Sequence, residues 1–122
     1  MAKRYTIELP GTHPTINQWS RMHFMARLNL NNQWKKTVWG AAKAAKIPMI
    51  KNPVEIEIEY HHKYKSTDKR RLDIDNFVPK FICDGLVGVV ILDDSIDYVK
   101  KLTWSVIKDG EDRSIIFIKE LS

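Results

Sequence analysis

The stretch VEIEIEY at residues 54–60 decides the fold class, because apolar and acidic residues alternate along it without a break. Successive side chains of a strand point to opposite faces of a sheet, so Val54, Ile56 and Ile58 share one face and the glutamates share the other. Val, Ile and Tyr are also residues that favour strands. The pattern predicts a β-strand here, and the elements expected on either side of it define the fold.

Upstream of this strand, the sequence predicts one further strand and one helix. Residues 5–9 alternate apolar and polar side chains, and Pro10-Gly11 ends that strand. Residues 10–30 are rich in turn formers and are expected to be irregular. The asparagines at 29, 31 and 32 are candidate helix caps, so we expect a helix that begins near them and ends at Pro48.

Downstream, the sequence predicts a second helix and two more strands. The helix is expected over residues 77–87, capped by Asp75 or Asn76. Strands over residues 98–107 and 113–119 are expected to form a hairpin across Asp109-Gly110. The resulting fold class is α+β, a single domain over residues 1–122 with one mixed β-sheet and two helices, in the order strand-helix-strand-helix-strand-strand.

Composition limits the classes of protein to which the chain can belong. It has 122 residues, 43% of them hydrophobic, which suits one folded domain with one core. The lone cysteine, Cys83, cannot form an internal disulfide, and no signal peptide or membrane span is evident. We expect a soluble cytoplasmic protein that does not contact a membrane. No glycine-rich or Walker motif is present, so no nucleotide cofactor is expected.

Charge is distributed unevenly along the chain. Residues 1–71 carry 14 Lys and Arg against 5 Asp and Glu, whereas residues 72–122 carry 6 against 10. The most basic stretch, residues 61–71, ends in Lys69, Arg70 and Arg71. A basic half joined to an acidic half suits a phosphate-bearing partner and a metal site, although ordinary scatter of charge gives the same totals.

Closely spaced carboxylates directly follow the basic stretch. Asp73 and Asp75 flank Ile74, and Asp93-Asp94-Ser95 follows about 20 residues later. Carboxylates at this density repel one another unless a cation lies between them, and Mg²⁺ prefers such oxygen ligands. In an extended segment Asp73 and Asp75 would point to one side while Ile74 faces the core, and folding would have to bring Asp94 to them. The alternative is that these acids only cap a helix and form turns.

The chain resembles the RusA family of Holliday junction resolvases. The resemblance is most specific over residues 70–95, in RRLDIDN at 70–76, Lys80, DGL at 84–86 and LDDS at 92–95. A proline-rich opening, with Leu9-Pro10 and PTIN at 14–17, is also similar. One residue more separates Asp75 from Lys80 than in the commoner family spacing, and Pro79 lies in that gap. This departure favours a later start for the second helix.

The resemblance implies a function and assigns site residues. It implies a Mg²⁺-dependent endodeoxyribonuclease that acts as a homodimer on four-way (Holliday) junctions, a branched DNA, in DNA recombination and repair. By motif position Asp73, Asp75 and Asp94 would bind Mg²⁺, and Lys80 would be a catalytic lysine. Lys69, Arg70 and Arg71 would bind the DNA backbone. Independently of the resemblance, Trp19 is the tryptophan best suited to stack on a base, because it lies in the segment expected to be irregular.

Two alternatives stay open at this point. The chain could be a nucleic-acid-binding module without catalysis, with Lys80 forming only a surface ion pair with Asp84 one helical turn away. It could also be a phosphatase or glycosyltransferase with its own Asp-x-Asp site, although Asn76 does not fit the phosphatase pattern. Dispersal of Asp73, Asp75 and Asp94 by more than ~10 Å would favour the binding module, because Mg²⁺–oxygen bonds are only ~2.1 Å long.

Overall fold

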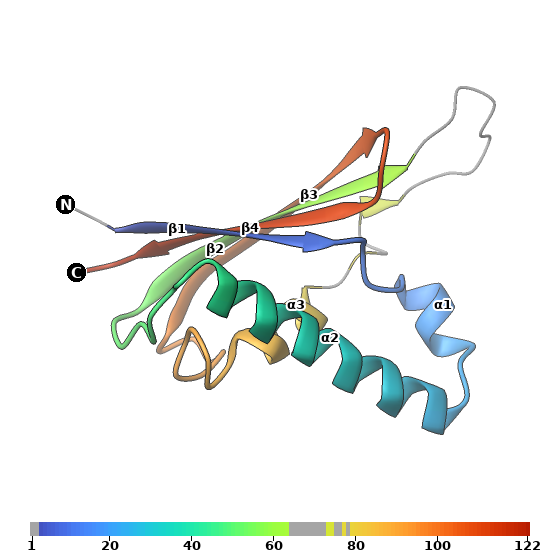
Figure 1. Cartoon of the computed structure of the whole chain (residues 1–122), viewed down its shortest axis with the longest axis horizontal. Helices are drawn as coiled ribbons and strands as arrows, with labels where there is room; N and C mark the ends of the chain where they lie inside the picture. The colour runs from blue at the N-terminus through green and yellow to red at the C-terminus, as the bar shows by residue number, and fades with distance from the viewer. Residues whose placement is uncertain (1–2, 64–72, 75–76, 78) are drawn as a thin grey trace.

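A computed structural model describes residues 3–63, 73–74, 77 and 79–122 of the chain. Within these residues, four strands and three helices interleave along the sequence (Figure 1). They are β1 (Arg4–Pro10), α1 (Ile16–Ser20), α2 (Phe24–Ala44), β2 (Val54–Lys63), α3 (Lys80–Leu86), β3 (Val99–Asp109) and β4 (Arg113–Glu120). The predicted α+β class is confirmed, with one helix more than expected. None of the described helices is apolar over enough of its length to cross a membrane.

The four strands form one mixed sheet in the order β1-β4-β2-β3. Strand β2 runs parallel to β3 and antiparallel to β4, and Ile58 is paired with Trp104 on one side and Ile116 on the other. The predicted hairpin of residues 98–107 with 113–119 is therefore wrong. The chain does reverse after Asp109, but β3 and β4 flank β2 instead of pairing with each other, because β2 offers both of its edges to them.

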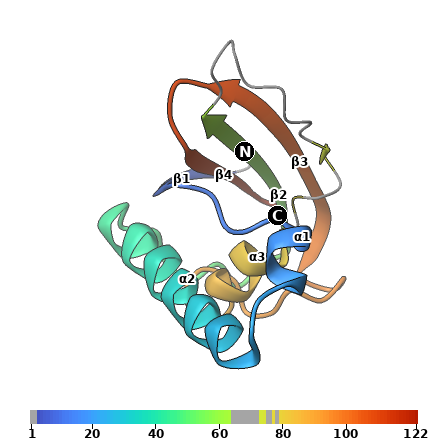
Figure 2. The ribbon, with the colours of Figure 1, turned by 90° about the vertical axis from the view of Figure 1, so that its right-hand side faces the viewer.

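The helices cover one face of the sheet, and none of the described helices lies on the other, which we call the open face (Figure 2). Between sheet and helices lies a core of buried apolar side chains, including Leu9, Ile58, Tyr60, Ile82 and Leu86. The alternation at residues 54–60 has the predicted effect, since Val54, Ile56, Ile58 and Tyr60 are all buried. Burial of this face fixes the register of β2, because a slip by one residue would turn its glutamates into the core.

The segment expected to be irregular instead contains α1 and the first turns of α2. Thr15 and Gln18 form a capping box at the start of α1, with Gln18 N–H bonded to Thr15 Oγ1 at 3.3 Å and Thr15 N–H bonded to Gln18 Oε1 at 2.9 Å. Helix α2 begins at Phe24 with His23 as its cap, so the predicted asparagine caps are wrong. Arg27 ties the two helices together by donating to the carbonyl oxygens of Trp19 and Ser20 at 3.0 and 2.8 Å.

Helix α3 is shorter than predicted and begins later, at Lys80. Pro79 holds the N-cap position with φ of −65°, and its side chain has no acceptor for a capping hydrogen bond. The expectation of a cap by Asp75 or Asn76 is therefore wrong, and the later start suggested by Pro79 is confirmed. Most of this helix is core, because Phe81, Ile82, Cys83, Gly85 and Leu86 are buried.

The crossing of α3 over α2 depends on Gly85. A Cβ atom at this position would lie 2.8 Å from Cβ of Val38 and 3.0 Å from its Cγ2, closer than real side chains approach. Val38 is fully buried and cannot move aside. We expect Gly85→Ala to lower the free energy of unfolding by about 1–3 kcal/mol through this overpacking. Chemical denaturation monitored by circular dichroism measures it.

Gly40 provides the matched control for this substitution. It lies in α2, is exposed, and has open space where a Cβ would be placed. Gly40→Ala should therefore raise the free energy of unfolding by about 1 kcal/mol, as alanine favours a helix over glycine. If Gly85→Ala stabilised the protein as much as Gly40→Ala does, the close packing of α3 on α2 would be wrong.

Candidate active site

Asp73 lies beside the edge strand β3, on the face of the sheet that carries the helices. The segment is held there by its backbone, because the indole N–H of Trp104 donates to the Ile74 carbonyl oxygen at 3.0 Å. The N–H of Phe77 donates to the same oxygen at 3.3 Å, and the Phe77 ring is buried. Asp73 itself is exposed. This arrangement places one of the predicted metal ligands at the surface, on a short anchored turn.

The conformation of this turn differs from the expected one. Ile74 was expected to face the core from an extended segment, but it is 53% exposed and lies in a 3₁₀ turn. Phe77, and not Ile74, is the apolar residue of this segment that packs into the core. The alternation of side chains along a strand therefore does not set the direction of Asp73.

Asp94 lies in the loop that follows α3, and part of this loop is buried. Val90 and Ile91 are buried, and the Val90 carbonyl oxygen accepts a hydrogen bond from Ile50 N–H at 2.7 Å, which fixes the chain that leads to Asp94. Asp94 is exposed, and its backbone N–H donates to the Asp93 carboxylate at 2.9 Å. Asp93 therefore shapes the turn that presents Asp94.

The electrostatics of α3 link Asp94 to this helix. Burial, together with the negative charges of Asp94 and Asp84, raises the pKa of the Cys83 thiol to about 12. An exposed carboxylate has such an effect only at short range, since water and salt screen its charge. The loop turns back on the end of α3, because the N–H groups of Val90 and Ile91 donate to the Leu86 carbonyl oxygen at 2.9 and 3.1 Å, and Asp94 follows three residues after Ile91.

Lys80 forms the ion pair that we had considered as an alternative to a catalytic role. Its Nζ lies 3.4 Å from Oδ2 of Asp84, one turn along α3. The Lys80 side chain is 73% exposed, whereas that of Asp84 is only 22% exposed. Exposed pairs of this kind contribute only about 0.3–0.5 kcal/mol, so the ammonium group can exchange this partner for a phosphate at little cost.

The remaining predicted site residues, Asp75, Lys69, Arg70 and Arg71, lie outside the described residues. Within the described part of the chain, no three His, Cys, Asp or Glu side chains are grouped so that they could hold a metal ion. The predicted set needs Asp75 as its third member. The two members that are described, Asp73 and Asp94, are exposed carboxylates, the kind of hard oxygen donor that suits Mg²⁺.

Beneath α3 lies a buried polar pair that sequence reasoning missed. His13 is 2% exposed, and its Nδ1–H donates to the Pro14 carbonyl oxygen at 2.9 Å. Its Nε2 must then be the acceptor for the Tyr60 hydroxyl, 2.8 Å away. Burial lowers the pKa of His13, which keeps the ring neutral, and burial also raises the pKa of Tyr60. The pair joins the segment before α1 to β2, and the His13 ring supports Phe81 of α3 at 4.9 Å.

His61 and His62 open the basic stretch of residues 61–71, but they do not lie in a solvated loop. Strand β2 continues to Lys63, which puts both histidines in the sheet. His61 is buried, with Nδ1 at 2.9 Å from Asp109 Oδ2 and Nε2 at 3.3 Å from Glu59 Oε1. The backbone N–H of Gly110, together with His61, lowers the pKa of Asp109. These side chains hold the ends of β2 and β3 together and play no part near α3.

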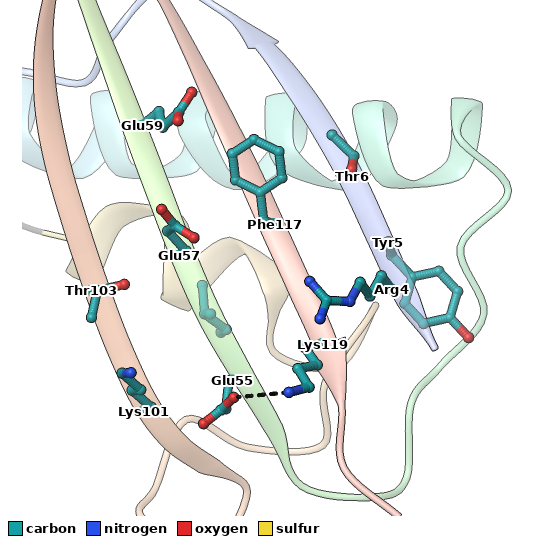
Figure 3. A pocket seen from close by; sticks show the side chains of 11 residues that line it. Arg4, Tyr5, Thr6, Glu55, Glu57, Glu59, Lys101, Thr103, Phe117 and Lys119 are labelled. Carbon is teal, nitrogen blue, oxygen red and sulfur yellow. Dashed lines mark ion pairs between the residues drawn. The ribbon is translucent and has the colours of Figure 1, made fainter. Parts of the chain in front are cut away.

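The open face of the sheet carries acidic residues along its centre. Glu55, Glu57 and Glu59 follow one another on β2, and they line a hollow of about 430 Å³ together with side chains from β1, β3 and β4 (Figure 3). Lys119 Nζ lies 3.9 Å from Glu55, whereas no described residue forms an ion pair with Glu57. Three basic side chains, Arg4, Lys101 and Lys119, line the same hollow as the three glutamates, so its lining residues carry no net charge.

Comparisons with known proteins identify the family of the chain. A search of curated proteins found no match. The family model described as endodeoxyribonuclease RusA matches residues 11–119, a range that includes every predicted site residue and each helix. Because this match covers most of the 122 residues, the chain belongs to the RusA endodeoxyribonuclease family.

Proposed function

We propose that this protein is a Mg²⁺-dependent endodeoxyribonuclease that resolves four-way DNA junctions during recombination and repair. The observation that carries the proposal is the family match over residues 11–119. Support also comes from two exposed carboxylates, Asp73 in the segment that Trp104 anchors to β3 and Asp94 in the loop that follows α3. A cytoplasmic location is part of the proposal, supported by the single, buried cysteine.

Asp73, Asp75 and Asp94 would hold the metal ion in this proposal. Bound Mg²⁺ supplies Lewis acidity toward the scissile phosphate and lowers the pKa of a bound water. Asp94 would suit this role, because the Asp93 carboxylate accepts from its backbone N–H and the preceding Val90-Ile91 segment is buried. The carboxylates of Asp73 and Asp94 are exposed and can be reached by a substrate.

Positive charge on the same side of the molecule would position the DNA. Lys80 would leave its ion pair with Asp84 and neutralise charge that develops on the phosphate in the transition state. Lys69, Arg70 and Arg71 would bind neighbouring phosphates of the backbone. Because Lys80 and the segment of Asp73 lie on the side of the sheet that carries the helices, the DNA would approach from that side.

A homodimer is the assembly that suits this substrate. A four-way junction has approximate two-fold symmetry, and its resolution needs matched cuts in two opposed strands. Two active sites related by a two-fold axis provide such cuts, and two-fold dimers are the commonest symmetric assemblies of soluble proteins.

A supercoiled plasmid that extrudes a cruciform tests both the activity and the paired sites. A cruciform persists only under supercoiling, and one cut releases the supercoiling, so a linear product requires both cuts within one bound complex. We expect linear plasmid in the presence of Mg²⁺ and no cleavage when EDTA removes the metal. A plasmid without the cruciform should stay intact. Nicked circles alone would contradict paired sites, and binding without any cleavage would favour the non-catalytic module.

A further inference from the structure

A small pocket opens where the three helices meet, directly beside Lys80. It has a volume of about 160 Å³ and is lined by Ile16 and Trp19 of α1, Asn31 of α2, and Lys80, Phe81 and Asp84 of α3. Sites for drug-sized ligands measure roughly 300–1,000 Å³, so this pocket suits a single planar ring. The described residues of the proposed metal site do not line it.

The aromatic walls of the pocket are held rigidly in place. The Trp19 ring meets Phe81 edge to face, with ring centroids 4.8 Å apart. His13 supports Phe81 from below at 4.9 Å. The Arg27 guanidinium carbon lies 5.7 Å from the centre of the Trp19 ring, and Arg27 also holds the Trp19 carbonyl oxygen. Because these contacts fix the rings in advance, a ligand would lose little free energy in ordering them.

The polar groups at the edge of the pocket suit a nucleobase better than an apolar ligand. Asn31 provides an amide that both donates and accepts hydrogen bonds, while Lys80 donates and Asp84 accepts. The edge of a nucleobase carries donors and acceptors side by side, and its faces stack on aromatic rings. Phosphates around such a base would also be attracted by Lys80 and Arg27.

We propose that this pocket binds one nucleobase that leaves the stack at the branch point of the DNA, next to the phosphate that is cut. This inference rests on the proposed function, because Lys80 is both a wall of the pocket and the proposed catalytic lysine. It gives the enzyme a means of selecting branched DNA. A base at a branch point leaves its stack more readily than a base inside a duplex, where unstacking costs a few kcal/mol.

Abasic substitutions in the junction, combined with variants of the pocket, test this proposal. A single abasic nucleotide is moved through the branch point, and junction affinity is measured by fluorescence anisotropy with Ca²⁺ in place of Mg²⁺. The wild-type protein should bind one abasic position roughly 5- to 150-fold more weakly than the intact junction, the range for one base–aromatic stack. Trp19→Ala should bind the intact junction more weakly by a similar factor, and the abasic nucleotide at that position should have no further effect on it.

Two further variants keep the test decisive if Trp19→Ala unfolds. Asn31→Leu replaces the amide by a bulkier apolar side chain within α2, leaves the contact of Trp19 with Phe81 in place, and should also abolish the abasic effect. Trp39→Ala removes a tryptophan of α2 that is 46% exposed and outside the pocket, and should keep the full effect.

The outcomes separate this proposal from the proposed function. If the wild-type protein cuts junctions but binds every abasic junction within about twofold of the intact one, the pocket proposal is wrong and the function stands. The pocket proposal is also wrong if folded Trp19→Ala and Asn31→Leu variants still bind the abasic junction more weakly than the intact junction, by the same factor as the wild-type protein. If the wild-type protein neither binds nor cuts junctions, both proposals fail.

Discussion

The Asp94→Asn variant should bind a four-way junction as tightly as the wild-type protein and cut it slower by about three orders of magnitude or more. The amide keeps the size of the side chain, and Asp94 is exposed, so the fold should not change. The substitution removes one negative charge from the proposed metal site, which weakens metal binding. It also reduces repulsion of the phosphates, so affinity without metal should hold or rise. Single-turnover cleavage and anisotropy measure the two effects separately.

Asp97→Asn is the matched control for this variant. Asp97 is an exposed aspartate three residues further along the same loop, so the substitution makes the same change of charge outside the proposed metal site. It should cut at close to the wild-type rate. Asp73→Asn and Asp75→Asn should behave as Asp94→Asn does. Cleavage by a folded Asp94→Asn variant at near wild-type rate would remove Asp94 from the active site.

The second large effect is expected from the basic segment. Replacing Lys69, Arg70 and Arg71 with alanine should flatten the plot of log affinity against log salt concentration by up to ~0.9 for each lost phosphate contact. For three contacts, raising the salt from about 50 to about 200 mM should weaken binding about 40-fold more in the wild-type protein than in the variant. Anisotropy titrations at several salt concentrations measure the slope.

A triple variant on α2 controls for the loss of charge. Lys35, Lys36 and Lys43 are exposed residues of this helix, and their replacement by alanine removes the same three charges elsewhere. Lys46, the next lysine along the chain, is left unchanged in this variant. It lies beyond the helix with a φ of 57°, where alanine would be strained. If the α2 variant lost the salt dependence and the basic-segment variant kept it, the DNA would bind along α2.

Elements fixed by local patterns were predicted well from the sequence. The alternation at residues 54–60 identified β2. One face of this strand is buried, so its apolar residues occur at every second position of the sequence. Pro79 indicated the late start of α3, because a proline without an N–H is suited to the start of a helix. Burial of Val90 and Ile91, which delivers Asp94, followed from their apolar character.

Features that depend on distant partners could not be predicted. Asp109-Gly110 signals a reversal of the chain between β3 and β4. No local pattern shows that β2 lies between these two strands in the sheet. The first turns of α2 contain asparagines that disfavour a helix, and Arg27 stabilises them through carbonyl oxygens of α1. The contact of His13 with Tyr60 spans 47 residues, and nothing in the sequence around either residue indicates it.

The central claim is that Asp73, Asp75 and Asp94 hold one metal centre, and a crystal structure with bound Mn²⁺ tests it most directly. Mn²⁺ takes the same oxygen ligands as Mg²⁺, and its anomalous scattering locates it without assumption about the site. The account predicts a peak bonded to carboxylate oxygens of all three aspartates at about 2.1 Å. A peak elsewhere, for example along Glu55, Glu57 and Glu59, would contradict this account. So would a structure in which the three aspartates lie more than ~10 Å apart and bind no ion.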